Sequence, residues 1–156
     1  MANPVKAIPD GYHAITPYLV CDGAAGAIAF YKKVFGAQEL FPPMPAPGGK
    51  IGHAELRIGD SAVMLADESP EQGFRGPRAH NGSPVSLLLY VKDVDATFKA
   101  AVAAGAKALR EVKDQFYGDR SGTLEDPFGH VWTVATHVED VAPDEMERRM
   151  KAQMGG

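Results

Sequence analysis

The chain has 156 residues, of which 45% are hydrophobic and 23% are charged, as in an ordinary globular protein of one domain or two small repeats. A formal net charge of −4 without a long Lys/Arg run argues against a nucleic-acid-binding protein. The single cysteine, Cys21, excludes an internal disulfide and a CxxC motif. No apolar run resembles a signal peptide or is long enough for a membrane span, so a cytoplasmic protein without a membrane partner is expected.

The first half of the chain predicts a strand, a helix and then three further strands. The expected elements are a strand at 12–20, a helix at 23–35, a short strand at 38–41, a loop at 42–49, and a hairpin of strands at 53–58 and 61–67. Asp22 can cap the helix, and Gly36 ends it. The loop prediction rests on the run PPMPAPGG, which does not suit regular structure.

The same order of elements then restarts after a long segment, residues 69–84, that is rich in Pro and Gly. The expected elements are a strand at 85–91, a helix capped by Asp93 with a stripe of Val94, Phe98, Ala101 and Val102, and strands at 108–115, 119–125 and 130–137. The halves also match locally, since V-C-D and V-K-D precede the two helices and Gly-Ala follows each of them. A repeated β-α-β-β-β unit is therefore predicted, followed by a short helix from Pro143.

The last strand pair carries the clearest pattern in the chain. A tight turn is expected at residues 126–129, with Pro127 and Gly129 setting its geometry. In the returning strand, Thr133 and His137 share one face, while Trp132 lies on the other. An apolar face and a polar face predict a sheet with a helix behind it and a pocket before it.

Three residues are candidates for acid–base chemistry. His53 and Glu55 are two apart on one strand face, so they can bind a metal or act as a base and its orienting partner. The alternative is a salt-bridged polar face that Arg57 completes. His137 can bind an anion, act as an acid or base, or simply close its strand.

Aromatic residues are the stronger indication of a ligand. Tyr18, Tyr90, Phe116 and Tyr117 offer flat apolar surfaces, three of them with a hydroxyl, which suit planar organic molecules. The alternative is that they fill an ordinary core. Arg120 can neutralise a carboxylate or phosphate, or it can pair with Asp119 or Glu125 of a neighbour.

The chain resembles the vicinal-oxygen-chelate superfamily, which includes glyoxalase I, bleomycin-resistance proteins and extradiol dioxygenases, and within it the PhnB-like branch. The stretches that carry the resemblance are TPYLVCDGAAGAIAFYKKVFGA, GHAELRIGDSAVMLADE, SPVSLLLYVKDVDATF and QFYGDRSGTLEDPFGHVWTVATH. The resemblance implies an α+β fold in which two βαβββ modules form a half-barrel cleft, commonly in a homodimer. The expected parts are an arm at 1–11, modules at 12–68 and 85–140 joined by a loop at 69–84, and a helical tail at 141–156.

The resemblance also bears on metal binding. Metal-dependent members carry His or Glu ligands on the first and last strand of each module, and the matching positions here are Thr16, Leu65, Ser86 and Thr133. Leucine cannot bind a divalent cation, and neutral hydroxyls are poor ligands beside His and carboxylate. No cofactor is therefore expected, and Leu88 stands where relatives in this branch often have a histidine.

The expected function is binding of a small aromatic or amphipathic molecule in the cleft, without the four-ligand metal site. The residues expected to contact it are Thr16, Tyr18, Leu65, Ser86, Leu88, Tyr90, Phe116, Tyr117, Arg120 and Thr133. The alternative is a lyase, isomerase or dioxygenase that uses His53 and Glu55, either with a divalent metal or by acid–base chemistry alone. A catalytic protein would also have His137 available.

Overall fold

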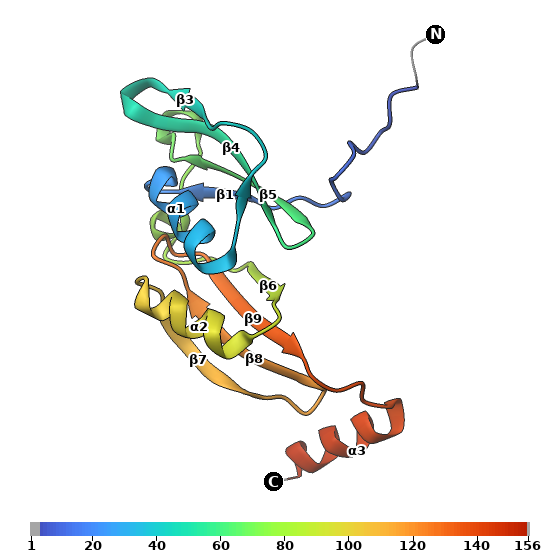
Figure 1. The fold of residues 1–156 in the computed structure, drawn as a ribbon. Helices are drawn as coiled ribbons and strands as arrows, with labels where there is room; N and C mark the ends of the chain where they lie inside the picture. Colours follow the sequence, from blue (N-terminus) through green and yellow to red (C-terminus); the bar gives the residue numbers. More distant parts are fainter. Residues whose placement is uncertain (1–3, 156) are drawn as a thin grey trace. The chain divides into compact units, whose positions relative to one another are not determined.

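The computed structural model describes residues 4–155, which divide into two compact units between Gly82 and Ser83 (Figure 1). Each unit contains one β-sheet and a helix that packs on one face of that sheet. The strand order is β1-β5-β4-β2 in the first unit and β6-β9-β8-β7 in the second, so the same connectivity occurs twice. The predicted α+β fold with two βαβββ modules is confirmed.

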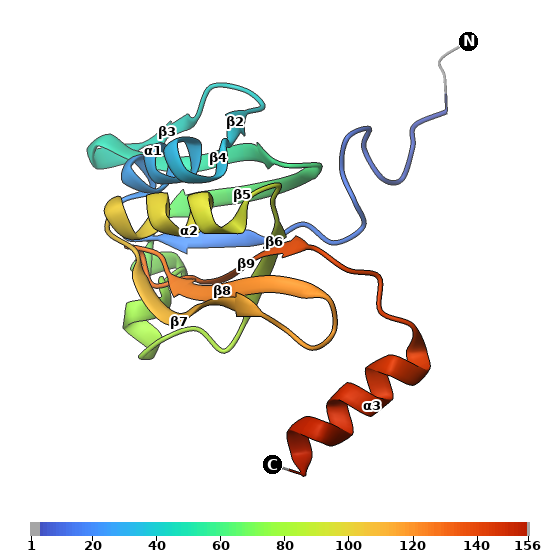
Figure 2. The same ribbon diagram turned by 60° about the horizontal axis from the view of Figure 1, so that its bottom comes forward.

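The first unit begins with a strand and a helix. Its elements are β1 Tyr18–Cys21, α1 Ala24–Phe35, β2 Gln38–Glu39, β3 Met44–Ala46, β4 Lys50–Ile58 and β5 Ser61–Asp67, with short 3-10 turns at Pro47–Gly49, Pro70–Gln72 and Pro77–His80. β1 runs parallel to β5, and β5 runs antiparallel to β4. Figure 2 shows α1 beside the strands of this sheet, and it packs on β1, β4 and β5. Ile28, Tyr31 and Phe35 recur at helical spacing and are buried, which fixes this face of α1 against the strands.

The cap of α1 differs from the prediction. The cap position is Gly23, and the Asp67 carboxylate accepts hydrogen bonds from the backbone nitrogens of Gly23, at 3.1 Å, and Ala24, at 2.8 Å. Asp22 is therefore not the cap. A carboxylate at a helix N-terminus satisfies free N–H groups and interacts favourably with the helix dipole, wherever in the sequence it originates. At the other end, Gly36 closes the helix with φ 66°, as predicted.

Several predicted boundaries in the first unit are wrong; β4, for example, starts at Lys50 instead of residue 53. The first strand starts at Tyr18 instead of residue 12, because only Tyr18–Cys21 pairs with β5. The run 42–49 is not an irregular loop, since β3 pairs antiparallel with the start of β4 and a 3-10 turn joins them. Pro45 lies on an edge strand, where the missing N–H removes no central ladder bond.

The second unit repeats the arrangement. Its elements are β6 Ser86–Tyr90, α2 Val94–Ala103, β7 Lys107–Asp114, β8 Asp119–Glu125, β9 Val131–His137 and α3 Pro143–Met154. Asp93 caps α2 through the Ala96 nitrogen at 3.0 Å, as predicted. Val94 and Phe98 are buried against the sheet, whereas Val102 is 42% exposed and does not belong to the predicted stripe.

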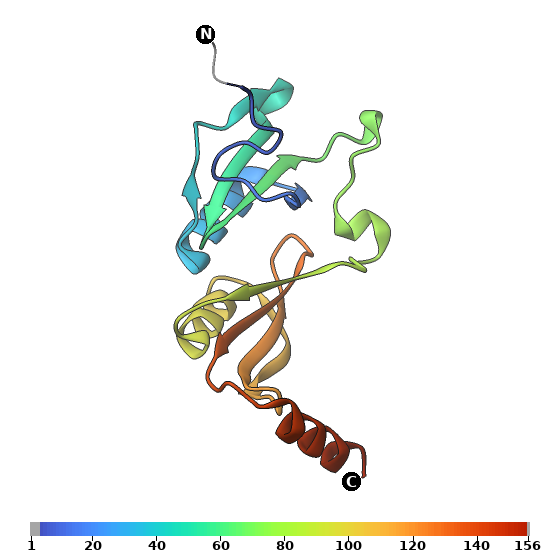
Figure 3. The same cartoon turned by 90° about the vertical axis from the view of Figure 1, so that its right-hand side faces the viewer.

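α3 lies apart from the sheet of its own unit in all three views (Figure 3). The predicted helix from Pro143 is confirmed, but it buries no residue. Arg149 connects α3 to the rest of the second unit. It forms an ion pair with Glu139 at 2.7 Å and donates a hydrogen bond to the Phe116 carbonyl oxygen at 3.2 Å. Acidic residues in its first turn and Lys151 in its last turn suit the helix dipole.

Candidate ligand-binding site

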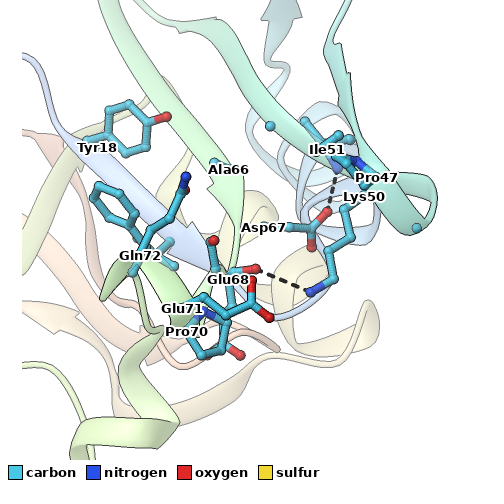
Figure 4. Close-up of a pocket in the computed structure, with 16 residues that line it drawn as sticks. Tyr18, Pro47, Lys50, Ile51, Ala66, Asp67, Glu68, Pro70, Glu71 and Gln72 are labelled. Carbon is cyan, nitrogen blue, oxygen red and sulfur yellow. Dashed lines mark hydrogen bonds between the residues drawn. The ribbon is translucent and has the colours of Figure 1, made fainter.

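A pocket of about 790 Å³ opens in the first unit. The ends of β1 and β5 form one side, the turn between β3 and β4 forms another, and the segment that follows β5 closes the rest (Figure 4). The lining residues are Tyr18, Val20, Ala46, Pro47, Gly48, Lys50, Ile51, Gly52, Ala66, Asp67, Glu68, Ser69, Pro70, Glu71, Gln72 and Phe74. This volume lies within the usual range for sites of small organic ligands.

Two acidic residues hold the walls of the pocket together. One oxygen of Asp67 caps α1, and the other accepts a hydrogen bond from the Ile51 nitrogen at 2.7 Å, which joins β5 to β4 (Figure 4). Glu68 accepts from the Gly76 nitrogen at 2.8 Å and thereby fixes the segment after β5. The Lys50 ammonium donates to the Glu68 carbonyl oxygen at 3.3 Å. The backbone around the pocket is therefore set by hydrogen bonds within the protein itself.

The pocket presents two aromatic side chains at its surface. Tyr18 is 48% exposed and Phe74 is 54% exposed. Aromatic side chains of this size are usually more deeply buried. Aromatic surface that stays exposed beside a cavity can be covered by an apolar part of a ligand, at about 25 cal/mol per Å² of buried apolar area. The two rings give the pocket its apolar contact surface.

Tyr18 also begins a chain of polar side chains. Its hydroxyl lies 2.8 Å from His53 Nδ1, and His53 Nε2 lies 2.9 Å from a Glu55 carboxylate oxygen. The other Glu55 oxygen accepts a hydrogen bond from the Tyr12 hydroxyl. His53 is further enclosed by the Phe41 ring, which stacks on it at a centroid distance of 6.3 Å. The structure thus joins the two sequence candidates His53 and Glu55, while Arg57 bonds to the Gly11 and Asp60 carbonyl oxygens instead.

The protonation of this chain follows from its hydrogen bonds. Burial raises the pKa of the Glu55 carboxyl, but the hydrogen bonds from His53 and Tyr12 outweigh it and hold this pKa below its ordinary value. Burial and the nearby Glu55 charge raise the pKa of the Tyr18 hydroxyl, which keeps its proton. An N–H at His53 Nε2 suits the Glu55 carboxylate, and Nδ1 then faces the Tyr18 hydroxyl as its hydrogen-bond partner.

A second polar chain lies in the second unit. The Tyr90 hydroxyl donates to one Asp119 oxygen at 2.8 Å, and His137 Nδ1 lies 2.7 Å from the other. His137 Nε2 lies 2.7 Å from Asp140, so carboxylates contact both ring nitrogens. Asp119 is buried and His137 is half exposed. Each unit therefore joins a tyrosine, a histidine and a carboxylate, but in a different order.

The position of His137 predicts a pH dependence of stability. Hydrogen bonds with Asp140 and then Asp119 raise the pKa of the His137 imidazole above its ordinary value of 6.5. The raised pKa contributes stability that is fully present below the unfolded-state value and is lost as pH rises through the folded-state value. We expect His137→Gln to lower the free energy of unfolding more at about pH 5.5 than at about pH 9. Denaturant unfolding followed by Trp132 fluorescence measures both values.

His13→Gln is the matched control for this experiment, because His13 is exposed and lies in the other unit. The control should change the free energy of unfolding of the second unit by the same small amount at both pH values. Equal losses for His137→Gln at both pH values would contradict the prediction.

The remaining candidates of the first unit lie in different environments. Thr16 is half-buried just before β1. Leu65 is 0% exposed, in register with Leu19 and Ala54 in the centre of the sheet. The expected contact between Leu65 and a ligand is therefore not seen, because its side chain is part of the core.

The candidates of the second unit lie on the sheet and at one of its turns. Leu88 and Tyr90 are more than half exposed on β6, and Thr133 pairs with Thr123 through their hydroxyls at 3.0 Å. Ser86 is also exposed on this strand, and the rings of Phe116 and Tyr117 meet edge-to-face at a centroid distance of 5.3 Å. Binding roles for these residues stay predictions.

Arg120 is engaged by two carboxylates. It forms a two-point ion pair with Asp95 at 2.8 Å and a further contact with Asp114 at 3.1 Å. Within the chain its partners are thus Asp95 and Asp114, and the alternative of Asp119 or Glu125 of a neighbour stays a prediction. Binding of an anion at Arg120 would require displacement of these contacts.

Within residues 4–155, no group of three or more His, Cys, Asp or Glu side chains is arranged to hold a metal ion. The positions matched to the family's ligands hold Thr16, Leu65, Ser86 and Thr133, which are poor metal donors. None of the helices in this described part combines the length and apolar character needed to cross a membrane.

Sequence reasoning missed most of the pocket lining. Lys50, Glu68, Glu71 and Phe74 were not among the predicted contacts, although segment 69–84 was recognised as unusually long. The sequence contains one signal for this pocket: two Pro- and Gly-rich stretches, residues 42–49 and 69–84, lie next to strands that pair with each other. Only the β3–β4 pairing shows that these stretches face one cavity.

The fold and the sequence together define the class of protein. The family model of the Glyoxalase/Bleomycin resistance protein/Dioxygenase superfamily matches residues 12–134, so the chain belongs to this superfamily.

Particular relatives extend this assignment. An uncharacterized protein from Mycobacterium bovis is 44% identical over 146 residues, which cover 92% of this chain and 95% of that protein. The X-ray structure of an Arabidopsis thaliana gene product is 30% identical, with a TM-score of 0.61, and the match covers 80% of this chain and 98% of that one. The crystal structure of TioX from Micromonospora sp. ML1 is 25% identical, with a TM-score of 0.62, over 83% of this chain and 100% of that one.

Proposed function

We propose that this protein binds a small aromatic or amphipathic molecule, in the manner of the bleomycin-resistance members of its superfamily, and that it belongs to the PhnB-like branch. The observation that carries the proposal is the pocket of about 790 Å³ beside two half-exposed aromatic rings, Tyr18 and Phe74. Flat apolar surface next to convergent polar groups is the usual composition of a small-molecule site.

The proposal does not require a metal. The pocket walls consist of backbone that Asp67 and Glu68 hold in place, together with side chains that contact organic molecules well and metals poorly. A ligand that covers the rings of Tyr18 and Phe74 gains affinity mainly from buried apolar area. Binding with little rearrangement is expected, since the surrounding backbone is already fixed.

Titration with naphthalene derivatives tests the proposal directly. A flat molecule of about twelve non-hydrogen atoms, such as 2-naphthylmethanol, should bind saturably with a Kd of roughly 0.1–1 mM. Phe74→Ala should weaken this binding about tenfold or more, because it removes an entire ring from the contact surface. Ligand fluorescence and a thermal-shift assay give independent readings.

Leu109→Ala is the matched control, since Leu109 is 44% exposed on the second unit and does not line the pocket. It should leave the affinity unchanged. Failure of every flat aromatic ligand to bind by about 5 mM, a limit near −3 kcal/mol, would reject the proposal.

A second function, acid–base catalysis without a metal, is favoured by the hydrogen-bonded chain from Tyr18 through His53 to Glu55. A hydroxyl bonded to an imidazole that a carboxylate orients is the arrangement used to activate a group for proton transfer. In this case a bound ligand would be converted, and Glu55→Gln would abolish conversion while binding persists. Mass spectrometry of the incubated ligand separates the two functions.

A further inference from the structure

We propose that the pocket selects an aromatic molecule that carries a protonated amine, and that Tyr18 determines this specificity as a hydrogen-bond acceptor. The inference rests on the proposed function, because it names the class of ligand for the same pocket. Two independent features point to it: the direction of the hydrogen bonds through Tyr18, and the charges of the lining.

The first feature is the commitment of the Tyr18 proton. A phenolic hydroxyl has one proton to donate and lone pairs to accept with. We assign the Nε2–H tautomer to His53, which places a donor toward the Glu55 carboxylate at 2.9 Å and leaves Nδ1 to accept the Tyr18 proton at 2.8 Å. The Tyr12 hydroxyl donates to the same carboxylate and keeps it ionised. Tyr18 lines the pocket, and with its proton committed its oxygen has only lone pairs left for a ligand, so a ligand must supply the N–H or O–H.

The second feature is the excess of carboxylates. The lining contains Asp67, Glu68 and Glu71 against one cation, Lys50, which is a formal excess of two negative charges. Asp67 and Glu68 accept hydrogen bonds from backbone nitrogens, whereas no contact within residues 4–155 engages the exposed Glu71 carboxylate. A cationic ligand gains from this field and an anionic ligand is repelled.

The aromatic side chains favour the same ligand. The faces of Tyr18 and Phe74 attract an ammonium group, while their apolar surface covers a flat ring. A molecule that combines an aromatic ring with an amine therefore uses all three properties of the pocket.

Four matched naphthalenes test the proposal: 2-naphthylmethylamine, 2-naphthylmethanol, 2-(methoxymethyl)naphthalene and 2-naphthoate. They share one ring system but supply, in turn, a cationic donor, a neutral donor, a neutral acceptor and an anion. At about pH 7.5 we expect the amine to bind about fivefold more tightly than the alcohol, because of the carboxylates. The alcohol should bind about fivefold more tightly than the ether, because only the alcohol can donate to Tyr18. Naphthoate should bind most weakly.

Two substitutions separate the contributions. Tyr18→Phe removes the acceptor and should bring the alcohol to the affinity of the ether. Glu71→Gln keeps the shape, removes one charge and should reduce the preference for the amine over the alcohol about threefold or more. Glu111→Gln is the matched charge control, since this exposed residue of β7 lies in the other unit and should change neither ratio.

The results distinguish this inference from the function on which it rests. Equal affinities for the amine, alcohol and ether would leave a binding pocket but overturn the selection of an amine. Tighter binding of naphthoate than of the amine would overturn it as well. No binding by any of the four would reject the binding function together with the inference.

Discussion

Replacing Asp126 by alanine should destabilise the second unit by about 3 kcal/mol or more. The Asp126 carboxylate is 2% exposed and accepts hydrogen bonds from two backbone nitrogens and one side chain. Two come from the backbone nitrogens of Phe128 and His130, at 2.9 and 3.0 Å, and one from the indole nitrogen of Trp132 at 2.9 Å. Alanine would leave all three donors without this partner, and a buried donor without an acceptor costs its full desolvation.

Trp132 makes this prediction measurable in two ways. Its fluorescence reports unfolding, because it is the only tryptophan. A double-mutant cycle of Asp126→Ala with Trp132→Phe, followed by circular dichroism because the tryptophan is lost, should give a coupling of about 1–2 kcal/mol for the indole–carboxylate bond. Glu111→Ala, an exposed acid of the same unit, serves as the control and should change stability by less than about 0.5 kcal/mol. A loss for Asp126→Ala no larger than this control would show that the turn does not depend on the carboxylate.

Replacing Gly118 by alanine should cost about 3–5 kcal/mol, for two reasons that act together. Gly118 has φ 100°, a conformation that a side chain disfavours, and an added Cβ would lie 2.1 Å from the Glu139 carbonyl oxygen. The backbone nitrogens of Val138 and Glu139 both donate to the Gly118 carbonyl oxygen, at 2.9 and 3.0 Å. Relief of the clash would move this segment and break both hydrogen bonds.

Gly105→Ala separates the two reasons. Gly105 has a similar φ of 108°, but there the added Cβ would meet Pro127 only at an ordinary 3.6 Å. It should cost about 1–3 kcal/mol, from backbone strain alone. Equal losses at the two glycines, measured by denaturant unfolding, would mean that the contact with residue 139 contributes nothing.

Those parts of the fold that depend on local sequence were predictable. Asp93 caps α2 by accepting a hydrogen bond from the nitrogen of Ala96, only three residues further on. Gly36 ends α1 in the same local way. The strands β5 and β8 were predicted with their correct ends, because a turn residue or a change of pattern marks each end. These features involve partners close in the sequence, so a single stretch contains all the necessary information.

Features that depend on distant partners were not predictable in this way. The cap of α1 is Asp67, more than forty residues from the nitrogens that it binds. β3 forms only because β4 offers it an edge, although its own composition favours a loop. Likewise Leu65 pairs with the buried Leu19 of β1, whereas the exposed Tyr18 pairs with Met64, so Leu65 and Tyr18 lie on opposite faces of the sheet.

The candidate site was predictable in part for the same reason. His53 and Glu55 lie two apart on one strand, so their contact followed from the period of a strand. Their link to the pocket through Tyr18 spans thirty-five residues and requires the three-dimensional structure. The pocket wall around Glu71 and Phe74 comes from a segment without strand or α-helix, for which no periodicity exists to interpret.

The repeated strand order has a consequence for synthesis on the ribosome. Within the described residues every strand pairs inside its own unit, and β5, the last strand of the first sheet, ends at Asp67. The nascent chain can therefore complete the first sheet while the second half is still being translated. Strands that still lack their partners are then limited to one half of the protein at a time.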